Sequence, residues 1–415
     1  MNYKKIIWWS IIVAFGGFVF GFDTAVISGA EQEIQNLWNL SDTMIGQTVA
    51  MALYGTVIGA LLGGFPSEVL GRKRTLVFVA ILFLISAVGS AFSPEVYSLM
   101  FFRFIGGLAV GASCVVAPMY ISEISPTNKR GQLTALFQFN IVVGILISYL
   151  SNYFIGGASD GNWRIMLGIE IIPAALFLIL IFFVPRSPRW LILKKGLIDE
   201  AREVLQEIDP SQVESNIASI QYNQDNNESK GGLKEFFSGK FNIPISLAFL
   251  IAFFNQLSGI NAVIYYSPRI FAETGMGESA SLLSSVGVGF INLIATLLGI
   301  FLIDRMGRKF LMYICSFGYI ITLGLISLTF YTGFGEGTLL IPFLVFGFIA
   351  SHAVGQGAVI WVFISEIFPN NVRSYGNSLG SGTHWVFAAF IAAVFPFVTS
   401  TLGGGITFAI FTFIM

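Results

Sequence analysis

The sequence predicts an all-α membrane protein that consists of two related bundles of six helices. Composition is the first reason: 55% of the 415 residues are hydrophobic and only 11% are charged, whereas a soluble globular protein carries about 25% charged residues. So few charges cannot cover a water-exposed surface, and we expect lipid around most of the chain. The second reason is a repeat, because the pattern ISEIxP occurs at residues 121–126 and again at residues 364–369.

Eleven runs are long enough to cross a bilayer, which takes about 20 apolar residues in a helix. The predicted spans are residues 6–28, 44–65, 75–93, 96–120, 133–155, 163–184, 242–271, 281–303, 310–331, 338–364 and 376–399. The first run lacks a small-residue cleavage site and is predicted to be a retained span rather than a signal peptide. A twelfth run begins near Leu402 and reaches only Met415, which predicts a truncated last helix.

A polar segment separates the two predicted bundles. We expect an N-terminal bundle at residues 1–184, a linker with short helices at residues 185–240 and a C-terminal bundle at residues 241–415. Within the linker, helical spacing predicts an apolar face at Leu191, Leu197, Ala201, Val204 and Leu205. The stretch SIQYNQDNNESKGG that follows predicts a flexible connection, so we expect a small helical domain on one membrane face.

The distribution of Lys and Arg predicts the orientation, because cytoplasmic loops are rich in both. The cations of one face are Lys4, Lys5, Arg72, Lys73, Arg74, Lys129, Arg130, those of the linker, Arg305, Arg308, Lys309 and Arg373. The charges of the other face are Glu31, Glu33, Asp42, Glu95 and Glu336, with Arg164 and Arg269 as its evident cations. We therefore expect a multi-pass protein of the inner (plasma) membrane whose linker and termini are all cytoplasmic.

Several classes of function are excluded by the composition and by missing patterns. A net charge of −1 argues against nucleic acid as a partner. The sequence contains no metal-ligand spacing, nucleophile elbow or P-loop, so we expect neither an enzyme nor an ATP-driven pump, and no cofactor or metal. The two cysteines, Cys114 and Cys315, lie in apolar runs and are predicted to pack in the core rather than to form a disulfide.

A second repeated pattern supports the duplication. The stretches GGFPSEVLGRKR (63–74) and GIFLIDRMGRK (299–309) each place a carboxylate four residues before an arginine. Two parallel halves of six spans are typical of transporters. We expect a cytoplasmic gate built from the doubled charges Glu68, Arg72, Glu123 and Arg130 in one half and Asp304, Arg308, Glu366 and Arg373 in the other. The alternative is that these charges only anchor helix ends at the lipid headgroups.

Two embedded acids predict a proton site. Asp23 lies within the first span, where a carboxylate is costly and by default functional. Arg103 in the fourth span is its natural partner, and a change in their separation would change how strongly Asp23 holds a proton. Glu170 in the sixth span is a second embedded acid that could relay the proton. The alternative is a purely structural pair between Asp23 and Arg103.

The chain resembles the sugar porters of the major facilitator superfamily over essentially its whole length. The matching stretches are FGFDTAVISGA (20–30), the two arginine-containing turns, RFIGGLAVG (103–111), PMYISEISP with RG (118–131), NQLSGINAVIYYSP (255–268) and WVFISEIFP (361–369). The similarity is closest to bacterial proton-coupled members such as xylose–proton symporters. These members have Asp at the position of Asp23, whereas animal glucose facilitators have Asn.

The resemblance implies a function that the residues alone do not reveal. It implies a twelve-helix transporter, active as a monomer, that imports a hexose or pentose together with a proton by alternating access. A facilitative uniporter is the alternative, and a transporter-like sugar sensor is a further one. The sugar contacts that it implies are Gln138, Asn255, Gln256, Asn261, Tyr265, Asn292, Gly357, Trp361, His384 and Trp385.

The chemistry of these residues suits a neutral polyol, since amides both donate and accept hydrogen bonds and aromatic rings cover the C–H faces of a sugar. Asn261 and Tyr265 share a helix face, and Ser258-Gly259 is predicted to unwind the helix before them. The alternatives are amides that bond a neighbouring helix and tryptophans that pack in the core. His352 is predicted to be a packing residue.

Four positions depart from the family pattern. Glu68 replaces an aspartate, Asn255 replaces a glutamine, and His384 replaces an amide residue, so its role stays open. Arg186 replaces a glutamate in the segment after the sixth span, which predicts that one ion pair of the family is absent or rewired. The identity of the sugar is left open by these observations.

Overall fold

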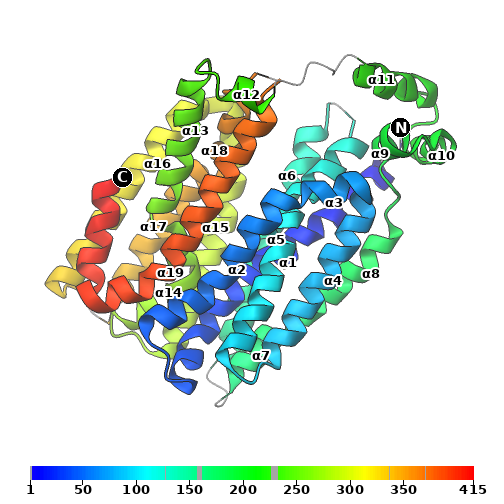
Figure 1. Cartoon of the computed structure of the whole chain (residues 1–415). Coiled ribbons are helices and arrows are strands. Elements are labelled where there is room, and N and C mark those ends of the chain that lie inside the picture. The colour runs from blue at the N-terminus through cyan, green and yellow to red at the C-terminus, as the bar shows by residue number, and fades with distance from the viewer. Residues whose placement is uncertain (1, 127, 157–160, 226–231, 336, 370) are drawn as a thin grey trace.

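A computed structural model of the chain contains two helix bundles that lie side by side (Figure 1). It describes residues 2–126, 128–156, 161–225, 232–335, 337–369 and 371–415, apart from the side chains of residues 223–225 and of residue 304. Every regular element in these ranges is a helix. The helices of the first bundle are α1 (Tyr3–Leu37), α2 (Asp42–Leu62), α3 (Gly64–Val69), α4 (Arg72–Ala91), α5 (Val96–Ile124), α6 (Arg130–Ile155), α7 (Asn162–Gly168), α8 (Ile171–Leu180) and the 3-10 turn η1 (Ile181–Phe183).

The second bundle repeats the arrangement of the first. Its helices are α13 (Asn242–Leu257), α14 (Ile260–Ala272), α15 (Glu278–Met306), α16 (Arg308–Thr332), α17 (Leu340–Val354), α18 (Gln356–Glu366) and α19 (Arg373–Ile414). In the first bundle α1 packs on α6, α2 on α5 and α4 on α5; in the second α13 packs on α19, α15 on α17 and α16 on α17. Among the described residues, eleven helical stretches are long and apolar enough to cross a membrane, which confirms the eleven predicted spans.

Glycines allow neighbouring helices to approach closely, as is usual in membrane bundles. A Cβ atom at Gly107 in α5 would lie 1.8 Å from the backbone oxygen of Ala52 in α2. A Cβ at Gly46 in α2 would lie 2.1 Å from the backbone oxygen of Ala393 in α19, which belongs to the other bundle. Small residues therefore determine packing both inside a bundle and between the two bundles.

Three glycines interrupt spans of the second bundle. Gly259, with φ +83°, separates α13 from α14, which confirms the break predicted at Ser258-Gly259. Gly355 separates α17 from α18, and a Cβ there would lie 2.2 Å from that of Cys315; this break was not predicted. Gly403, with φ +77°, divides α19, so the predicted twelfth run forms its own helical segment after this residue.

The linker helices lie at one end of the bundles, which we call the linker end; the opposite end is the far end (Figure 1). The linker contains α9 (Pro188–Trp190), the π-helical turn η2 (Leu191–Lys195), α10 (Ile198–Ile208), α11 (Val213–Asp225) and α12 (Leu233–Phe236). The helix α10 contacts the first bundle, because Lys5 pairs with Glu207 at 2.9 Å. The helix α12 contacts the second bundle, because Asn371 donates to Glu235 at 3.0 Å.

Two expectations for the linker are wrong in part. Leu197 is 45% exposed, whereas Leu191, Ala201 and Leu205 are buried as predicted. The reason is Gly196, whose left-handed conformation (φ +65°) turns the chain before α10 begins. The stretch predicted to be flexible begins with helix, since α11 extends to Asp225; residues 226–231 lie outside the described part of the chain.

Contacts between the two bundles gather toward the far end. There the Tyr149 hydroxyl of α6 donates to the backbone oxygen of Ile264 in α14 at 2.6 Å, and Gly289 of α15 lies against Leu146 and Tyr149 of α6. Among the described residues, each ion pair at the linker end joins groups of one bundle or its attached linker helices. The bundles are therefore held together at the far end, and Figure 1 shows them diverging toward the linker end.

Candidate functional site

Asp23 and Arg103 form a buried ion pair inside the first bundle. The Nη1 of Arg103 donates to Oδ1 of Asp23 at 2.6 Å and to the Asp23 backbone oxygen at 3.3 Å. Asp23 is 2% exposed and Arg103 is 1% exposed. Within the described part of the chain, Nε and Nη2 of Arg103 have no hydrogen-bond partner, so the guanidinium has spare donors beside the one carboxylate.

Glu170 completes a three-residue charged cluster with Asp23 and Arg103. It lies where the sixth span is interrupted between α7 and α8, is 2% exposed, and interacts electrostatically with both residues. Its Oε1 has no hydrogen-bond partner among the described side chains and backbone groups. One guanidinium can neutralise only one of two buried carboxylates, and burial opposes an uncompensated charge. The cluster therefore contains one more acid than its single guanidinium can neutralise.

The second bundle reaches this cluster through Tyr265. This residue lies in α14, is 2% exposed, and interacts electrostatically with Arg103 and Asp23. The same helix carries Asn261 one turn earlier. The helix α14 thus connects the charged cluster of one bundle to the polar residues of the other.

Three amide side chains form a hydrogen-bonded cluster across the break between α13 and α14. Asn261 donates to Oε1 of Gln256 at 2.6 Å, and Nε2 of Gln256 donates to Oδ1 of Asn255 at 2.8 Å. The same Nε2 also lies 3.1 Å from a ring nitrogen of His384 in α19. The left-handed Gly259 turns the chain between Gln256 and Asn261, which brings together two side chains that a straight helix would separate.

Aromatic side chains lie beside the amides. The rings of Trp361 and His384 are 4.9 Å apart, and those of His384 and Trp385 are also 4.9 Å apart. Trp361 is 37% exposed, whereas Trp385 is 9% exposed and packs edge-on against Phe20 of α1 at 5.9 Å. Trp361 is therefore the more accessible of the two tryptophans, and Trp385 is a contact between the bundles.

The remaining predicted sugar contacts are placed differently. Gln138 lies half-buried on α6, and Asn292 on α15 accepts a hydrogen bond from Thr296 at 3.5 Å. A Cβ atom at Gly357 would lie 3.2 Å from the His352 backbone oxygen, so the chain packs closely there in this conformation, and the role of Gly357 in sugar binding stays a prediction. His352 packs as predicted and shares a hydrogen bond with Tyr319 at 2.5 Å.

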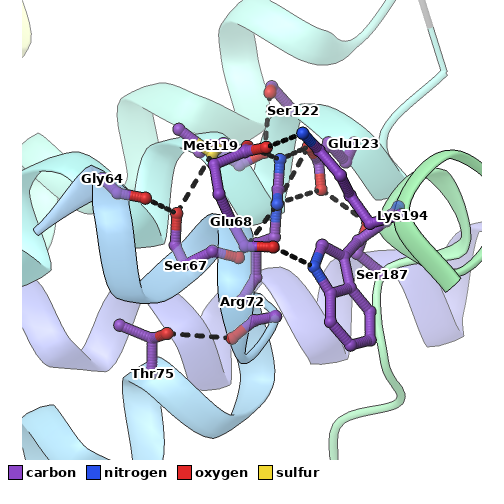
Figure 2. A network of polar contacts seen from close by, with 12 residues as sticks. Gly64, Ser67, Glu68, Arg72, Thr75, Met119, Ser122, Glu123, Ser187 and Lys194 are labelled. Carbon is purple, nitrogen blue, oxygen red and sulfur yellow. Dashed lines mark hydrogen bonds and ion pairs between the residues drawn. The ribbon is translucent and has the colours of Figure 1, made fainter.

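At the linker end of the first bundle, Arg72 is the centre of a polar network (Figure 2). Its Nε lies 3.1 Å from both carboxylate oxygens of Glu123, and its Nη2 donates to Glu68 at 2.9 Å. Lys194 of η2 pairs with Glu68 at 2.9 Å, and the Ser187 hydroxyl donates to Glu123 at 2.5 Å. The linker is thus bonded to the first bundle through the predicted gate residues.

The second bundle contains the equivalent pair. Arg308 donates through Nε and Nη2 to the Glu366 carboxylate at 3.2 and 2.9 Å. In this conformation Arg130 is exposed at the start of α6, and Arg373 donates to the Phe368 backbone oxygen at 3.3 Å. Their part in the gate stays a prediction. The side chain of Asp304 lies outside the described residues.

The departure at Arg186 has a local consequence. Arg186 pairs with Glu200 of α10 at 3.2 Å, so the arginine is bonded within the linker. That an ion pair of the family is absent or rewired here stays a prediction.

A second charged cluster, at the far end, was not predicted as a unit. Glu31 of α1 accepts from Arg269 of α14 at 2.9 Å through Nε, and Nη2 of the same arginine also donates to Glu31 and to Gln35. Outside the membrane-spanning segments, Glu273 follows α14. Partial burial raises the pKa of Glu273 to about 7; Arg269 lowers it, while the charges of Glu31 and Asp42 raise it. The sequence had indicated Glu31, Asp42 and Arg269 only as charges of one membrane face.

Together, the fold and these clusters define a membrane transporter of two homologous bundles, with a buried acid–guanidinium cluster in the first and a cluster of amide and aromatic side chains in the second. Residues 9–415 match the Sugar (and other) transporter family, and the chain belongs to that family. The D-xylose transporter of Levilactobacillus brevis is 38% identical, over 95% of this chain and 87% of its own length. The D-xylose-proton symporter of Escherichia coli (strain K12) is 35% identical, over 93% and 84% respectively.

Solved structures agree with this assignment. The xylose transporter XylE from E. coli in a partially occluded inward open conformation superposes with a TM-score of 0.86 and 31% sequence identity, covering 99% of this chain and 96% of that one. The predicted fold, that of the sugar porters in the major facilitator superfamily, is confirmed. The expectation of a transporter rather than an enzyme is confirmed by the family.

Proposed function

We propose that this protein is a sugar–proton symporter that imports a monosaccharide by alternating access. The observation that carries the proposal is the nearness of two sites: Tyr265 interacts electrostatically with Asp23 and Arg103, and it lies one helical turn after Asn261 of the amide cluster. The proton-coupled relatives support the same function, since one is a D-xylose-proton symporter.

The substrate that fits the central residues is a neutral polyol. Their amides donate and accept, and they carry no formal charge; the exposed face of Trp361 can cover the C–H side of a ring. We assign sugar contacts to Gln138, Asn255, Gln256, Asn261, Tyr265, Asn292, Trp361, His384 and Trp385, and to Gly357 in a conformation where His352 has moved. Its relatives include a D-xylose transporter and a glucose transporter, which suggests a pentose or a hexose.

Proton coupling follows from the charge balance of the cluster. When Asp23 is protonated, Arg103 can turn its spare donors toward an ionised Glu170. When Asp23 is ionised, it takes the charge of Arg103, so Glu170 is either protonated or left without a counter-charge. Rocking of the bundles moves Tyr265 relative to this cluster and so changes the affinity for the proton. One charge crossing 100 mV supplies about 2.3 kcal/mol, enough for roughly 50-fold accumulation of a neutral sugar.

We further propose the cellular arrangement. The linker end, with residues 185–240, faces the cytoplasm of a cell bounded by its plasma membrane, because the cations gather there; both termini are proposed to be cytoplasmic. The units are residues 1–184, 185–240 and 241–415, and the protein works as a monomer. The pairs Arg72–Glu123 and Arg308–Glu366, with Glu68 and Asp304, form the cytoplasmic gate, which Arg130 and Arg373 join when the bundles close at this end.

Uptake of a panel of radiolabelled monosaccharides into vesicles, with and without an imposed proton gradient, tests the proposal. Symport predicts accumulation above the external concentration only when the gradient is present. A sugar that equilibrates at the same rate with or without the gradient would identify a uniporter. Failure of every monosaccharide to enter would reject sugar transport.

A further inference from the structure

A buried ion pair between Glu31 and Arg269 joins the two bundles at the far end. Glu31 belongs to α1 and is 0% exposed, and the Arg269 side chain, on α14, is 12% exposed. Two guanidinium nitrogens donate to the two carboxylate oxygens, which is the bidentate geometry of strong ion pairs. The residues are 238 positions apart, so the pair connects elements that only the tertiary fold brings together.

The same guanidinium also organises the start of α2. Gln35 accepts from Arg269 and donates to Asp42 at 2.9 Å, and Asp42 lies 3.9 Å from Nη1 of Arg269. One cation of the second bundle therefore holds the end of α1 and the beginning of α2, both in the first bundle.

The ion pairs of the linker end differ in kind. Arg72 with Glu123 and Arg308 with Glu366 each join helices of a single bundle, so they survive when the bundles move apart. The pair of Glu31 and Arg269 exists only while α1 and α14 lie together. The net free energy of this ion pair therefore contributes to the free-energy difference between the conformer that is closed at the far end and the conformer that is open there.

We propose that Glu31 and Arg269 form a far-end latch that sets the balance between these two conformers. The proposal rests on the alternating access of the proposed function. In the open conformer water hydrates Glu31 and Arg269 separately. The latch therefore stabilises the closed conformer only by the free-energy difference between the paired and the hydrated side chains. We expect Glu31→Gln to raise the ratio of far-end-open to far-end-closed molecules by about tenfold, the change that corresponds to 1.4 kcal/mol.

The test is a distance distribution across the far end. Spin labels are attached at Tyr97→Cys in the first bundle and Glu278→Cys in the second, both exposed, after replacement of Cys114 and Cys315 by alanine. Pulsed electron paramagnetic resonance in lipid nanodiscs then reports the two conformers. Glu31→Gln and Arg269→Gln are each expected to increase the long-distance population, and the double reversal Glu31→Arg with Arg269→Glu is expected to restore the short one.

Matched controls remove the same charges without breaking the latch. Glu33 is two residues from Glu31 and accepts from the backbone N–H groups of Gly161 and Trp163. Arg164 donates to the backbone oxygen of Ala91. All of these contacts lie within the first bundle. Glu33→Gln and Arg164→Gln are expected to leave the distances unchanged. Equal distributions for Glu31→Gln, Glu33→Gln and the parent would overturn the proposal, as would a loss of thermal stability without a change in distance.

The measurement separates this proposal from the proposed function. The distances need neither sugar nor a proton gradient, so a shift in a protein that transports no sugar would support the latch and reject sugar symport. Unchanged distances in a protein that does accumulate sugar would reject the latch alone.

Discussion

Arg103 donates to Asp23 over 2.6 Å although the two residues are 80 positions apart and each is almost completely buried. Two donor nitrogens of the same guanidinium have no partner in the described part of the chain, and the second acid, Glu170, lies within electrostatic reach. An ion pair built only for stability would satisfy its donors, because unmet buried groups are costly. The spare donors therefore suit a site whose acids exchange a proton.

Asp23→Asn is expected to abolish proton-driven accumulation and to keep sugar exchange. The amide preserves the shape and a hydrogen bond to Arg103 but cannot carry a proton at neutral pH. In vesicles the accumulation ratio should fall from well above one to about one. Counterflow of labelled sugar serves as the control, and continued accumulation under a pH gradient would show that Asp23 is not the carrier.

Gln256→Ala is expected to weaken sugar binding. Gln256 bonds Asn255, Asn261 and approaches His384, so its removal leaves buried polar partners unmet at a cost of about 1–3 kcal/mol. We expect the apparent affinity for sugar to fall roughly 5- to 100-fold, measured by titration calorimetry on the purified protein. Ser316→Ala on α16, whose hydroxyl donates to the Met312 backbone oxygen of the same helix, is the control and should bind sugar normally.

The two gate pairs are expected to contribute unequally to stability. The side chains of Arg72 and Glu123 are 8% and 6% exposed, so Arg72→Ala leaves a buried carboxylate and should cost roughly 3–5 kcal/mol. Those of Arg308 and Glu366 are 31% and 50% exposed, so Arg308→Ala should cost about 1 kcal/mol or less. Thermal unfolding in one detergent compares them; equal losses would mean that burial does not decide the difference.

Gly46→Ala is expected to disfavour the conformer closed at the far end. Its Cβ would lie 2.1 Å from the Ala393 backbone oxygen of the opposite bundle, and such overpacking costs about 1–3 kcal/mol. Cysteines placed at the far end should react faster with an impermeant reagent. Gly64→Ala, which has open space around the new Cβ, is the matched control, and identical rates in both variants would contradict the expectation.

The balance of conformers is expected to depend on pH through Glu273. The folded, far-end-closed protein gives this group a pKa of about 7 against an ordinary value of 4.5, so the closed conformer binds the proton more tightly than an open one with an ordinary pKa. The closed conformer is therefore favoured at low pH and loses that advantage as the pH rises from 4.5 to 7.

Label distances across the far end, followed from pH 4.5 to 8, check this dependence on Glu273. Glu273→Gln should remove the part of the pH-dependent change in distance that Glu273 causes. Glu278→Gln, at the exposed start of α15, is the control and should keep the pH-dependent change. Because Glu278 is a label position above, this control carries its label at another far-end position. If the pH-dependent change in distance is unaltered by Glu273→Gln, other acidic residues cause it.

Much of the architecture could be predicted because its causes are local. Runs of apolar residues predicted all eleven spans, and Gly259 indicated the break that brings Gln256 to Asn261. The charged positions of Asp23 and Arg103 also suggested their pairing, since a buried charge needs a partner. The break at Gly355 escaped prediction because its cause is the approach of Cys315 from a neighbouring helix, which no local pattern reveals.

By itself the sequence determined the number of spans, the duplication of the two halves and the kinds of side chain at the centre, because hydrophobicity, repeats and residue chemistry are written along the chain. Only the tertiary structure decided which charges meet. Glu31 meets Arg269 across the two bundles, whereas Arg130 remains exposed and Arg186 turns to Glu200. The energy of an ion pair depends on separation and burial, and both are properties of the packed helices rather than of the order of residues.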